Sequence, residues 1–451
     1  MPTASIQLRC PSCQSDLPWE QGTSITCTSC QLPYPSVGEI PWFYRDGERI
    51  LSDWKAQIGF YLQDIERSAQ MYAAAQSEKR NLKSTQTRLT HLQMAFIEQG
   101  KYVRRLLQPL VLAQIPQILK ETGVKLPVSQ GLFSYESNVF RDWCWGKEEN
   151  EKTLELYLEV IPKGFQPSSM VALGSGAGRL PLDLHVALNA QTSLLIDINP
   201  FFQLAAREVL AGSELKLVEF PIAPRSSQTA AVTRSLKHDF QMPLGDVRLL
   251  FADAMNPPLA SNSFDCLVAH WFLDIIPQDL RSILPRINRV LRPEGIFLCG
   301  GSCAFAAGGM ERRYSQEEVE EALLESGFEI VKTESRDLPY LKCPDSSHSR
   351  VERVSCLAAR KTREVVQPKD YRYLPEWITN STLSIPTHPT IQGSLVQHKV
   401  YLDILVHVDG KRNMQQVAAL FGRTYGLKPE EALAPVRSFL TREFESGIFG
   451  S

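Results

Sequence analysis

The chain has 451 residues, enough for two or three domains of ordinary size, and it carries a formal net charge of -2 with 22% charged residues. This near-neutral balance does not indicate nucleic acid as a partner, and no run of about 18 apolar residues predicts a membrane span. The first residues lack the apolar core of a signal peptide, so we expect a cytoplasmic protein.

The first expected element is a small metal-binding module. Four of the ten cysteines form two Cys-x-x-Cys pairs, Cys10 with Cys13 and Cys27 with Cys30, which are separated by thirteen residues. In a reducing compartment such a cluster is typical of a metal site, and four thiolates are ligands that structural zinc prefers. Four protein ligands leave no open position for catalysis. We therefore predict a zinc ribbon over residues 1–45 that binds structural Zn2+, with a chance pairing of two motifs as the alternative.

An amphipathic helical pattern follows, and we assign residues 50–150 to a helical extension of the catalytic domain. Long polar stretches alternate there with apolar residues, and residues 102–107 are expected to pack against the domain that follows. No chemistry is indicated by this segment alone. The apolar residues that recur along the pattern are Leu82, Leu89, Leu92, Met94 and Phe96.

The most informative stretch is residues 171–180, where an apolar strand runs into a glycine-rich turn, and a second apolar strand then ends in Asp197. Gly174, Gly176 and Gly178 let the backbone approach a ligand closely, and the carboxylate can accept hydrogen bonds from ribose hydroxyls. The pattern predicts a nucleoside-binding edge of an open α/β sheet, either for a dinucleotide or for S-adenosylmethionine.

Later segments distinguish between these ligands. Residues 249–254 read as a strand followed by an acid, Asp253, and residues 263–270 as a strand introduced by a turn. A helical pattern then runs to residue 291, where Leu-Arg-Pro-Glu-Gly predicts a turn before a late strand. This order resembles the class I S-adenosylmethionine-dependent methyltransferases. The resemblance implies a Rossmann-like α/β fold over residues 151–361 with S-adenosylmethionine as cofactor, and a sheet of this kind without a cofactor is the alternative.

Motifs on either side of the glycine turn narrow the resemblance. Residues 138–143 read Asn-Val-Phe-Arg-Asp-Trp, residues 197–202 read Asp-Ile-Asn-Pro-Phe-Phe, and residues 271–274 read Trp-Phe-Leu-Asp. Together with the Gly-Ala-Gly-Arg-Leu turn, these motifs resemble the carnosine N-methyltransferase family over residues 50–361. The resemblance implies transfer of a methyl group to a nitrogen atom.

The resemblance also assigns residues to the cofactor. Arg141 would pair with its methionine carboxylate, Asp197 would hold the ribose, Asp253 would hold the adenine, and His270 would lie near the sulfonium. Asn138 stands where the family has glutamine. From the residues alone, Arg141 would be a surface arginine and His270 a core histidine. The full implied set is Asn138, Arg141, Gly174, Gly176, Gly178, Asp197, Asp253, Ala254 and His270.

Asp274 is the residue that the resemblance assigns to catalysis and to substrate binding, with Tyr340 as a further substrate contact. Methyl transfer mainly requires alignment of the acceptor lone pair and exclusion of water. A carboxylate can hold an imidazole N–H or an amine, orient the opposite lone pair and accept a proton. A helix N-cap is the structural alternative for Asp274.

Departures from the family concern the acceptor. Residues 301–307 contain no histidine where the family has one, and a later tyrosine near Val351 is absent. Carnosine itself is therefore not expected as the substrate. Residues 220–234 form an insertion whose arginines could meet a carboxylate or a phosphate, or could simply be solvated.

The C-terminal part shows a change of pattern. Residues 362–389 are interrupted by proline, serine and threonine and predict a surface linker, after which helical character returns. Residues 390–451 resemble the small PqqD-like winged-helix domains, whose peptide-clasping members recruit leader peptides to modifying enzymes. The resemblance implies a leader peptide or protein partner, and a packing or dimerisation module is the alternative.

These patterns predict an S-adenosylmethionine-dependent N-methyltransferase that acts on a histidine- or amine-containing small molecule or peptide. An RNA methyltransferase guided by the zinc ribbon is a second interpretation, although the near-neutral charge makes nucleic acid an unfavoured partner. A catalytically inactive binding protein is a third, and the intact glycines and acids of the cofactor pattern argue against it.

Overall fold

The computed structural model divides the chain into two compact units, residues 1–374 and 375–451, and each is described by itself. Most of the linker predicted over residues 362–389 lies outside the described residues. None of the helices described is long and apolar enough to cross a membrane. The structure describes residues 6–19, 25–114, 131–238, 240, 245–276, 279–305, 313–368, 399–409 and 411–445.

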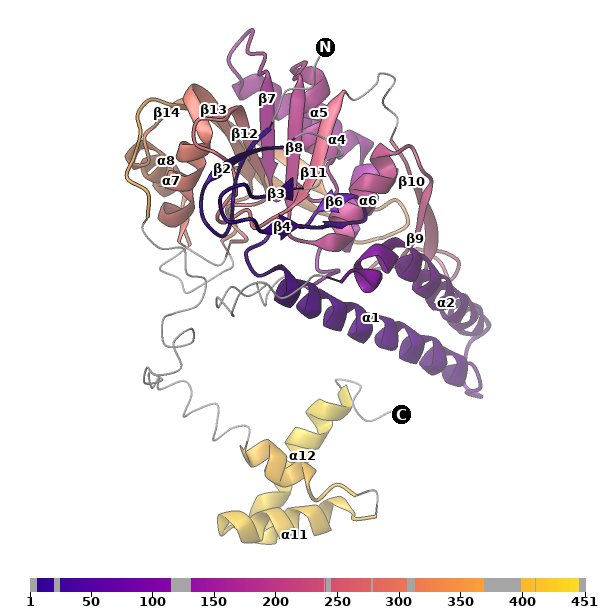
Figure 1. Ribbon diagram of the computed structural model, residues 1–451. Helices are drawn as coiled ribbons and strands as arrows, with labels where there is room; N and C mark the ends of the chain where they lie inside the picture. Colours follow the sequence, from indigo (N-terminus) through magenta and orange to yellow (C-terminus); the bar gives the residue numbers. More distant parts are fainter. Residues whose placement is uncertain are drawn as a thin grey trace. The chain divides into compact units, whose positions relative to one another are not determined.

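A seven-stranded sheet forms the centre of the first unit (Figure 1). Its strands are β7 (Ser169–Leu173), β8 (Thr192–Asp197), β11 (Asp246–Phe251), β12 (Phe264–His270), β13 (Leu291–Gly301), β14 (Phe328–Tyr340) and β15 (Arg350–Lys361). The order is β11-β8-β7-β12-β13-β15-β14, parallel from β11 to β13 and antiparallel beyond. After β7 the chain adds β8 and then β11 on one side of that strand, and it next forms β12 on the other side of β7. A topological switch point therefore lies between β7 and β12.

Helices cover both faces of the sheet. Successive side chains of a strand point to opposite faces, and consecutive residues of β7 and β8 are buried, so both faces need a covering layer. The helices are α4 (Lys147–Val160), α5 (Arg179–Ala187), α6 (Pro200–Leu210), α7 (Leu280–Val290) and α8 (Gln316–Glu325). Met170 and Ala172 of β7 pack with α4 and α5, whereas Val171 and Leu173 pack with α7 and α8. Leu195 of β8 packs in the same cluster as α6. This arrangement confirms the predicted α/β fold class.

The sequence Leu-Arg-Pro-Glu-Gly at residues 291–295 was predicted to form a turn before a late strand, and the structure differs here. This segment does not form a turn ahead of a strand but belongs to β13, where it bulges. Phe264 of β12 pairs with Leu291 and Cys266 pairs with Ile296, so the extra residues lie between two paired positions. Glu294 within the bulge has a left-handed φ of 64°. Proline and glycine are equally suited to a turn and to a bulge, so the local pattern does not distinguish them.

The N-terminal ribbon consists of short antiparallel strand pairs. Its strands are β1 (Ile6–Arg9), β2 (Asp16–Trp19), β3 (Ile25–Thr26), β4 (Pro33–Tyr34), β5 (Ser36–Val37) and β6 (Ile40–Pro41). Apolar side chains of the ribbon share one buried cluster with α7, so the ribbon packs on that face of the sheet. Trp42 forms a parallel bridge with Phe251 at the outer edge of β11. Arg248 of β11 donates to the Trp19 carbonyl oxygen at 2.9 Å and lies over the Trp19 ring.

Two long helices, α1 (Gly47–Ala75) and α2 (Lys83–Leu112), pack against each other after the ribbon. α2 also contacts α6 and β9 (Leu215–Glu219), and it packs with Ala230 and Ala231 directly before β10 (Val232–Leu236), the strand that pairs with β9. Val103, Leu106 and Leu107 are buried, which confirms the packing expected of this run. Residues 115–130 lie outside the described part of the chain.

The helical periodicity is only partly correct along α2. Leu89 and Leu92 are buried and Phe96 is half-buried, but Leu82 and Met94 are 71% and 62% exposed. Leu82 is the N-cap residue that precedes α2, so its direction does not follow the helical period. Met94 lies within α2, but the elements that pack on this helix leave most of its side chain exposed. The apolar character of a single position therefore does not establish burial on so long a helix.

The described residues of the second unit are helical. They contain a helix over 399–405, α11 (Met414–Tyr425) and α12 (Pro429–Glu445). Asn413 and Gln416 form a capping box at the start of α11, and the helices share a small apolar core that includes Phe421 and Val436. Residues 399–409 and 411–445 contain no strand, so the winged-helix part of the PqqD-like interpretation stays a prediction.

Candidate active site

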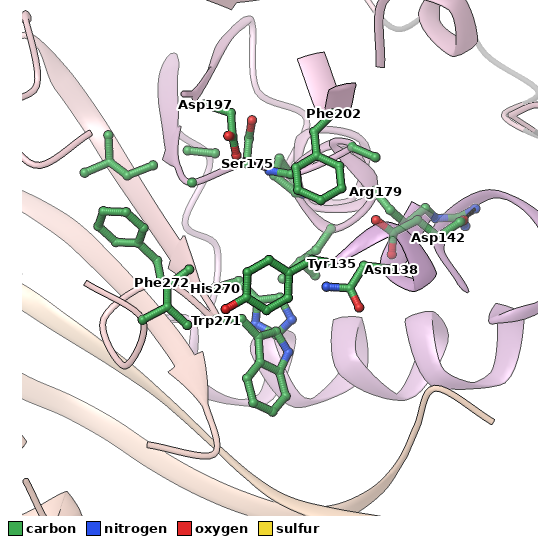
Figure 2. Close-up of a pocket in the computed structure, with 18 of the residues that line it drawn as sticks. Tyr135, Asn138, Asp142, Ser175, Arg179, Asp197, Phe202, His270, Trp271 and Phe272 are labelled. Atoms are coloured by element: carbon green, nitrogen blue, oxygen red, sulfur yellow. Dashed lines mark hydrogen bonds between the residues drawn. The ribbon is translucent and has the colours of Figure 1, made fainter. Parts of the chain in front are cut away.

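A cavity of about 340 Å³ opens at the carboxyl ends of the parallel strands, at the switch point between β7 and β12. Its wall includes all of the predicted cofactor and substrate residues except Gly178. Figure 2 shows Ser175, Asp197 and Phe202 near one another, and Tyr135, His270 and Trp271 gathered in another part of the cavity. We call the region around Gly174, Gly176, Asp197 and Asp253 the glycine-turn end. The region around Tyr135, Trp271, Asp274, Tyr340 and Glu352 is called the aromatic end.

The glycine turn connects β7 to α5 and has the backbone geometry that its sequence predicts. Gly174 and Gly176 have left-handed φ values of 62° and 55°. A Cβ atom on Gly174 would lie 2.5 Å from the Phe272 ring, whereas one on Gly176 would meet no atom within 4 Å. Gly174 is therefore required by packing, and Gly176 leaves its backbone open to the cavity.

Gly178 was expected to line the cofactor, but it does not line the cavity. Its φ is 88°, and a Cβ atom there would lie 3.0 Å from Leu195 of β8. This glycine allows the start of α5 to approach the sheet closely. The glycine thus serves helix–strand packing, and its contact with the cofactor stays a prediction.

Asp197 ends β8 beside the glycine turn. Its carboxylate accepts the backbone N–H of Gly176 at 2.8 Å and that of Asn199 at 2.8 Å. The side chain is buried, and burial raises the pKa of Asp197 to about 6 although these N–H groups oppose the change. The carboxylate is thus fixed in direction and still ionised near neutral pH.

Asp253 and Ala254 follow β11 at the same end of the cavity, and Asp253 accepts the backbone N–H of Met255 at 2.9 Å. The sequence did not indicate Tyr44, which comes from the end of the ribbon. Burial and the charges of Asp253 and Asp197 raise the pKa of Tyr44. The Tyr44 hydroxyl is buried and has no hydrogen-bond partner among the described residues. The ribbon therefore lies directly behind the glycine-turn end.

Arg141 lies in a π-helical turn, Arg141–Trp145, that follows α3 (Glu136–Phe140). Trp143 ties this turn to the glycine turn by donating to the Ala177 carbonyl at 3.0 Å. Arg141 is buried and pairs with Asp142 at 2.8 Å and Glu149 at 3.2 Å. Burial alone would lower the pKa of Arg141, but these carboxylates raise it. It is therefore a buried cation in the cavity wall, and not the surface arginine of the alternative interpretation.

His270 ends β12 and lines the cavity. The Tyr157 hydroxyl lies 3.1 Å from its Nδ1 atom. Burial, and secondarily the charge of Arg141, lowers the pKa of His270 to about 3. The imidazole is therefore neutral at physiological pH and is a weak base.

The aromatic end begins at Trp271, which has a left-handed φ of 50° and donates its backbone N–H to Gly300 at 2.8 Å. A bulky residue in this conformation is strained, and such strain is common at functional sites. The Trp271 and Tyr340 rings make an edge contact with centroids 5.0 Å apart. Arg350 lies over the Tyr340 ring at 4.4 Å and pairs with Glu352 at 2.7 Å.

Asp274 lies in this wall and is 7% exposed. Burial raises its pKa, and the backbone N–H of Ala304 favours its ionised form. Asp274 is not the N-cap of α7, because that cap is Asp279, which accepts the Arg281 N–H at 2.9 Å. No described cationic side chain forms an ion pair with Asp274. Its carboxylate is therefore available to a ligand.

Sequence reasoning missed two residues at the aromatic end. Tyr135 lies three residues before Asn138, and both line the cavity, so the spacing of one helical turn was an available signal. Glu352 stands near the position where a family tyrosine is lost. It is brought to the cavity by pairing of β14 with β15, which no local pattern reveals.

The arginines of the insertion over residues 220–234 do not line the cavity. Arg234 pairs with Glu219 at 2.7 Å and with Asp345 at 2.8 Å. Arg225 donates to the Ser346 carbonyl at 3.2 Å. These contacts connect the β9–β10 pair to the loop after β14. Arg225 and Arg234 therefore stabilise the fold and are not simply solvated.

The four ribbon cysteines, Cys10, Cys13, Cys27 and Cys30, come together as predicted, with all sulfur atoms within 4.8 Å of one another. The Cys13–Cys27 and Cys10–Cys30 sulfur distances are 3.5 and 3.7 Å. Zinc–sulfur bonds of about 2.3 Å in a tetrahedron separate the sulfurs by about 3.8 Å. The donor set and its spacing therefore fit a structural zinc ion.

Comparison with known proteins adds one match by sequence. Residues 223–299 match a family model described as a methyltransferase domain. No curated protein is similar enough to this chain to count as a match.

Several solved structures are similar in part. One is a chain of the complex between the Haloferax volcanii Trm112 methyltransferase activator and a methyltransferase, with 15% identity, a TM-score of 0.35 and coverage of 51% of this chain and 96% of that chain. A Thermotoga maritima protein described as a possible histamine N-methyltransferase has 15% identity, a TM-score of 0.31 and coverage of 51% and 98%. Haemonchus contortus phosphoethanolamine N-methyltransferase 2 has 16% identity, a TM-score of 0.32 and coverage of 52% and 57%.

These TM-scores are low, so the structural similarities carry no conclusion about substrate. The family match runs from the loop before β10 to most of β13. This part of the chain includes Asp253, His270 and Asp274. It agrees with the strand order and with the position of the cavity at the switch point. The chain therefore carries a class I S-adenosylmethionine-dependent methyltransferase domain.

Proposed function

We propose that this protein transfers a methyl group from S-adenosylmethionine to a nitrogen atom of an amine or imidazole in a small molecule or peptide. The observation that carries this proposal is Asp274. It is a buried carboxylate in the cavity wall, it has no ion-pair partner among the described residues, and aromatic side chains line the same cavity. A buried carboxylate in such a place favours a ligand that is cationic or donates an N–H group.

The glycine-turn end fits the cofactor. The open backbone at Gly176 and the fixed carboxylate of Asp197 would hold the ribose, and Asp253 with Ala254 would hold the adenine. Arg141 and Asn138 would contact the methionine part. The bound cofactor supplies a methyl group on a sulfonium, which is already activated for displacement.

His270 contributes by remaining uncharged. Because the pKa of its imidazole is about 3, it places no positive charge beside a sulfonium. The Tyr157 hydroxyl fixes the direction of the ring. In this proposal the residue shapes the cavity and does not remove a proton.

Asp274 would hold the acceptor and receive its proton. A carboxylate can accept an N–H from the acceptor and so direct the nitrogen lone pair toward the methyl group. Because burial raises the pKa of Asp274, it is a stronger base than an ordinary aspartate. The rings of Tyr135, Trp271 and Tyr340 would exclude water and favour a cationic group near their faces.

The test is transfer of label from methyl-labelled S-adenosylmethionine into a matched cell extract that is then separated into small molecules, peptides, proteins and RNA. We expect label in small molecules or peptides, and loss of that label with Asp274→Ala. Asp279→Asn is the matched control, because it changes a nearby aspartate outside the cavity and asparagine retains the helix cap.

Label in RNA would overturn this proposal in favour of RNA methylation guided by the ribbon. Full labelling by Asp274→Ala would remove the assigned role of the carboxylate. Absence of cofactor binding in a thermal-shift assay would favour a binding protein without catalysis. The proposed leader peptide or protein partner of residues 390–451 is tested separately, by comparing peptide labelling with and without that segment.

The ribbon is proposed to bind Zn2+ as a structural ion through its four cysteines. Metal analysis of protein purified without added zinc should give about one equivalent per chain. A clearly lower content in folded protein would contradict the assignment.

A further inference from the structure

Another cavity, of about 400 Å³, lies where the ribbon meets α7 and the loop after β11. Four arginines line it: Arg9 of β1, Arg45 just before α1, and Arg286 and Arg289 of α7. Asp253 is common to the walls of this cavity and of the candidate active site. The proposed methyl transfer gives the arginines of this second cavity no role.

Positive charge predominates in this lining. Among the described residues that form it, four guanidinium groups face two carboxylates, those of Asp46 and Asp253. Asp46 is already paired with Arg49, at 2.7 Å, and Arg49 is not part of the lining. Asp253 accepts the backbone N–H of Met255. Arg9, Arg45 and Arg289 alone outnumber the two carboxylates of the lining.

The arginines contact neutral backbone oxygens. Arg9 Nε donates to the Gln14 carbonyl at 3.0 Å, and Arg289 donates to the Pro257 carbonyl at 2.9 Å. Neither of these arginines nor Arg45 forms an ion pair with a carboxylate in the part of the chain that the structure describes. Burial, and next the charge of Arg9, lowers the pKa of Arg289 to about 10, so its guanidinium is still charged at neutral pH.

We propose that this cavity binds the phosphate group of a small phosphorylated molecule. Guanidinium groups match the oxygens of phosphate in geometry and in charge, and several of them converge here. Arg45 is exposed and Arg9 is half-buried, whereas Arg286 and Arg289 are 5% and 8% exposed. The positive charge therefore extends from an accessible rim to a buried floor.

The size of the cavity favours a small molecule over a nucleic-acid backbone. Its volume falls within the range of small-molecule sites and is larger than a single phosphate ion needs. Binding along a nucleic-acid strand instead requires an extended basic surface, and the net charge of the chain is -2. The cavity is bounded by the ribbon on one side and α7 on the other, so a ligand there would contact both elements.

The test is the thermal midpoint of the full-length protein in inorganic phosphate and in glycerol 3-phosphate, compared with chloride at equal ionic strength. We expect both phosphates to raise the midpoint above the chloride value. Arg9→Gln and Arg45→Gln should weaken phosphate binding about tenfold, because each removes a charged hydrogen-bond donor. Arg45→Lys should retain part of the effect. These two positions are chosen because neither arginine is fully buried, so folding should be preserved.

Arg80→Gln is the matched control. Arg80 is exposed in the turn between α1 and α2, and α1 spans 29 residues, or about 43 Å, from the rim of the cavity. This variant should keep the full phosphate effect. A parallel titration at saturating S-adenosylhomocysteine separates the two cavities, because the cofactor product should occupy the active site.

Persistence of the phosphate effect with S-adenosylhomocysteine, together with its loss in Arg9→Gln and Arg45→Gln, would support the proposal. An effect no larger than that of chloride would overturn it. A phosphate effect that S-adenosylhomocysteine abolishes, or that Arg9→Gln and Arg45→Gln retain, would place the anion elsewhere and also overturn it. Binding of a short RNA without any effect of either small phosphate would assign the arginines to nucleic acid instead.

Discussion

At the glycine-turn end of the cavity, Gly174, Gly176 and Asp197 come from two consecutive strands and the turns directly after them. At the aromatic end, Tyr135, Asp274 and Glu352 come from a helix start, a loop and an antiparallel strand that are far apart in the sequence. The first end is fixed by local backbone geometry, and the second depends on how distant elements pack. A local motif can therefore indicate the cofactor, while the acceptor depends on the tertiary structure.

The largest expected effect is on kcat, and it should distinguish the aromatic end of the cavity from the glycine-turn end. Asp274→Ala should lower kcat by about 100- to 10,000-fold, as expected for loss of a general base that also positions the acceptor. Affinity for S-adenosylhomocysteine should stay unchanged, because Asp274 lies at the aromatic end. Steady-state kinetics with the acceptor fraction identified by labelling, together with calorimetric titration, check both parts. A parallel loss of cofactor affinity would mean that the two ends are not independent.

The corresponding change at the glycine-turn end is Asp197→Asn. It should weaken S-adenosylhomocysteine binding by about 10- to 100-fold, because a charged acceptor of ribose hydroxyls is lost. Titration calorimetry measures the affinity, and the melting temperature shows whether the Gly176 and Asn199 contacts still support the fold. Unchanged affinity in a folded variant would place the ribose elsewhere.

A lower pH should also weaken cofactor binding at the glycine-turn end, but by less than the Asp197→Asn substitution. Because the pKa of Asp197 is raised to about 6, the carboxylate gains a proton as pH falls through that value. Ribose hydroxyls donate to the ionised form, so S-adenosylhomocysteine should bind about tenfold more weakly at pH 5 than at pH 7.5. Affinity measured across this range should lose most of its pH dependence in Asp197→Asn. A wild-type affinity that does not change would contradict the assignment.

The smallest effect concerns the contact between the ribbon and the glycine-turn end. Tyr44→Phe removes a buried hydroxyl that has no hydrogen-bond partner among the described residues. The free energy of unfolding should therefore rise by about 1 kcal/mol, with cofactor affinity unchanged. Urea denaturation and calorimetry measure these quantities. Weaker cofactor binding in this variant would show that the hydroxyl contacts the ligand and that the ribbon is part of the site.

The α/β fold, the glycine turn and the grouping of the four cysteines could be predicted because each depends on residues close in the sequence. Asp197 and Asp253 could be placed at one edge for a similar reason, since parallel strands end on the same side of a sheet. The same reasoning did not indicate that Gly178 packs on Leu195, because this contact depends on how closely α5 approaches β8. Local sequence contains no information on that distance.

Other features depended on pairing between distant segments. The bulge in β13 is defined by its partner β12, so Leu-Arg-Pro-Glu-Gly alone predicted a turn. Glu352 reaches the cavity through the pairing of β14 with β15, and Tyr44 reaches Asp253 through the docking of the ribbon. In α2, Met94 is exposed because the long helix is covered on part of its surface only. The periodicity of apolar residues does not indicate how much of a helix is covered.

The bridge between Trp42 and Phe251 has a consequence for the solubility of the protein. β11 is the outermost strand on its side of the sheet, and the Phe43 N–H also donates to the Phe251 carbonyl at 2.9 Å. An uncovered edge strand presents free N–H and C=O groups that can pair with another molecule. The end of the ribbon occupies part of this edge. A chain shortened by its first 46 residues should therefore tend to self-associate through β11, even if the sheet itself still folds.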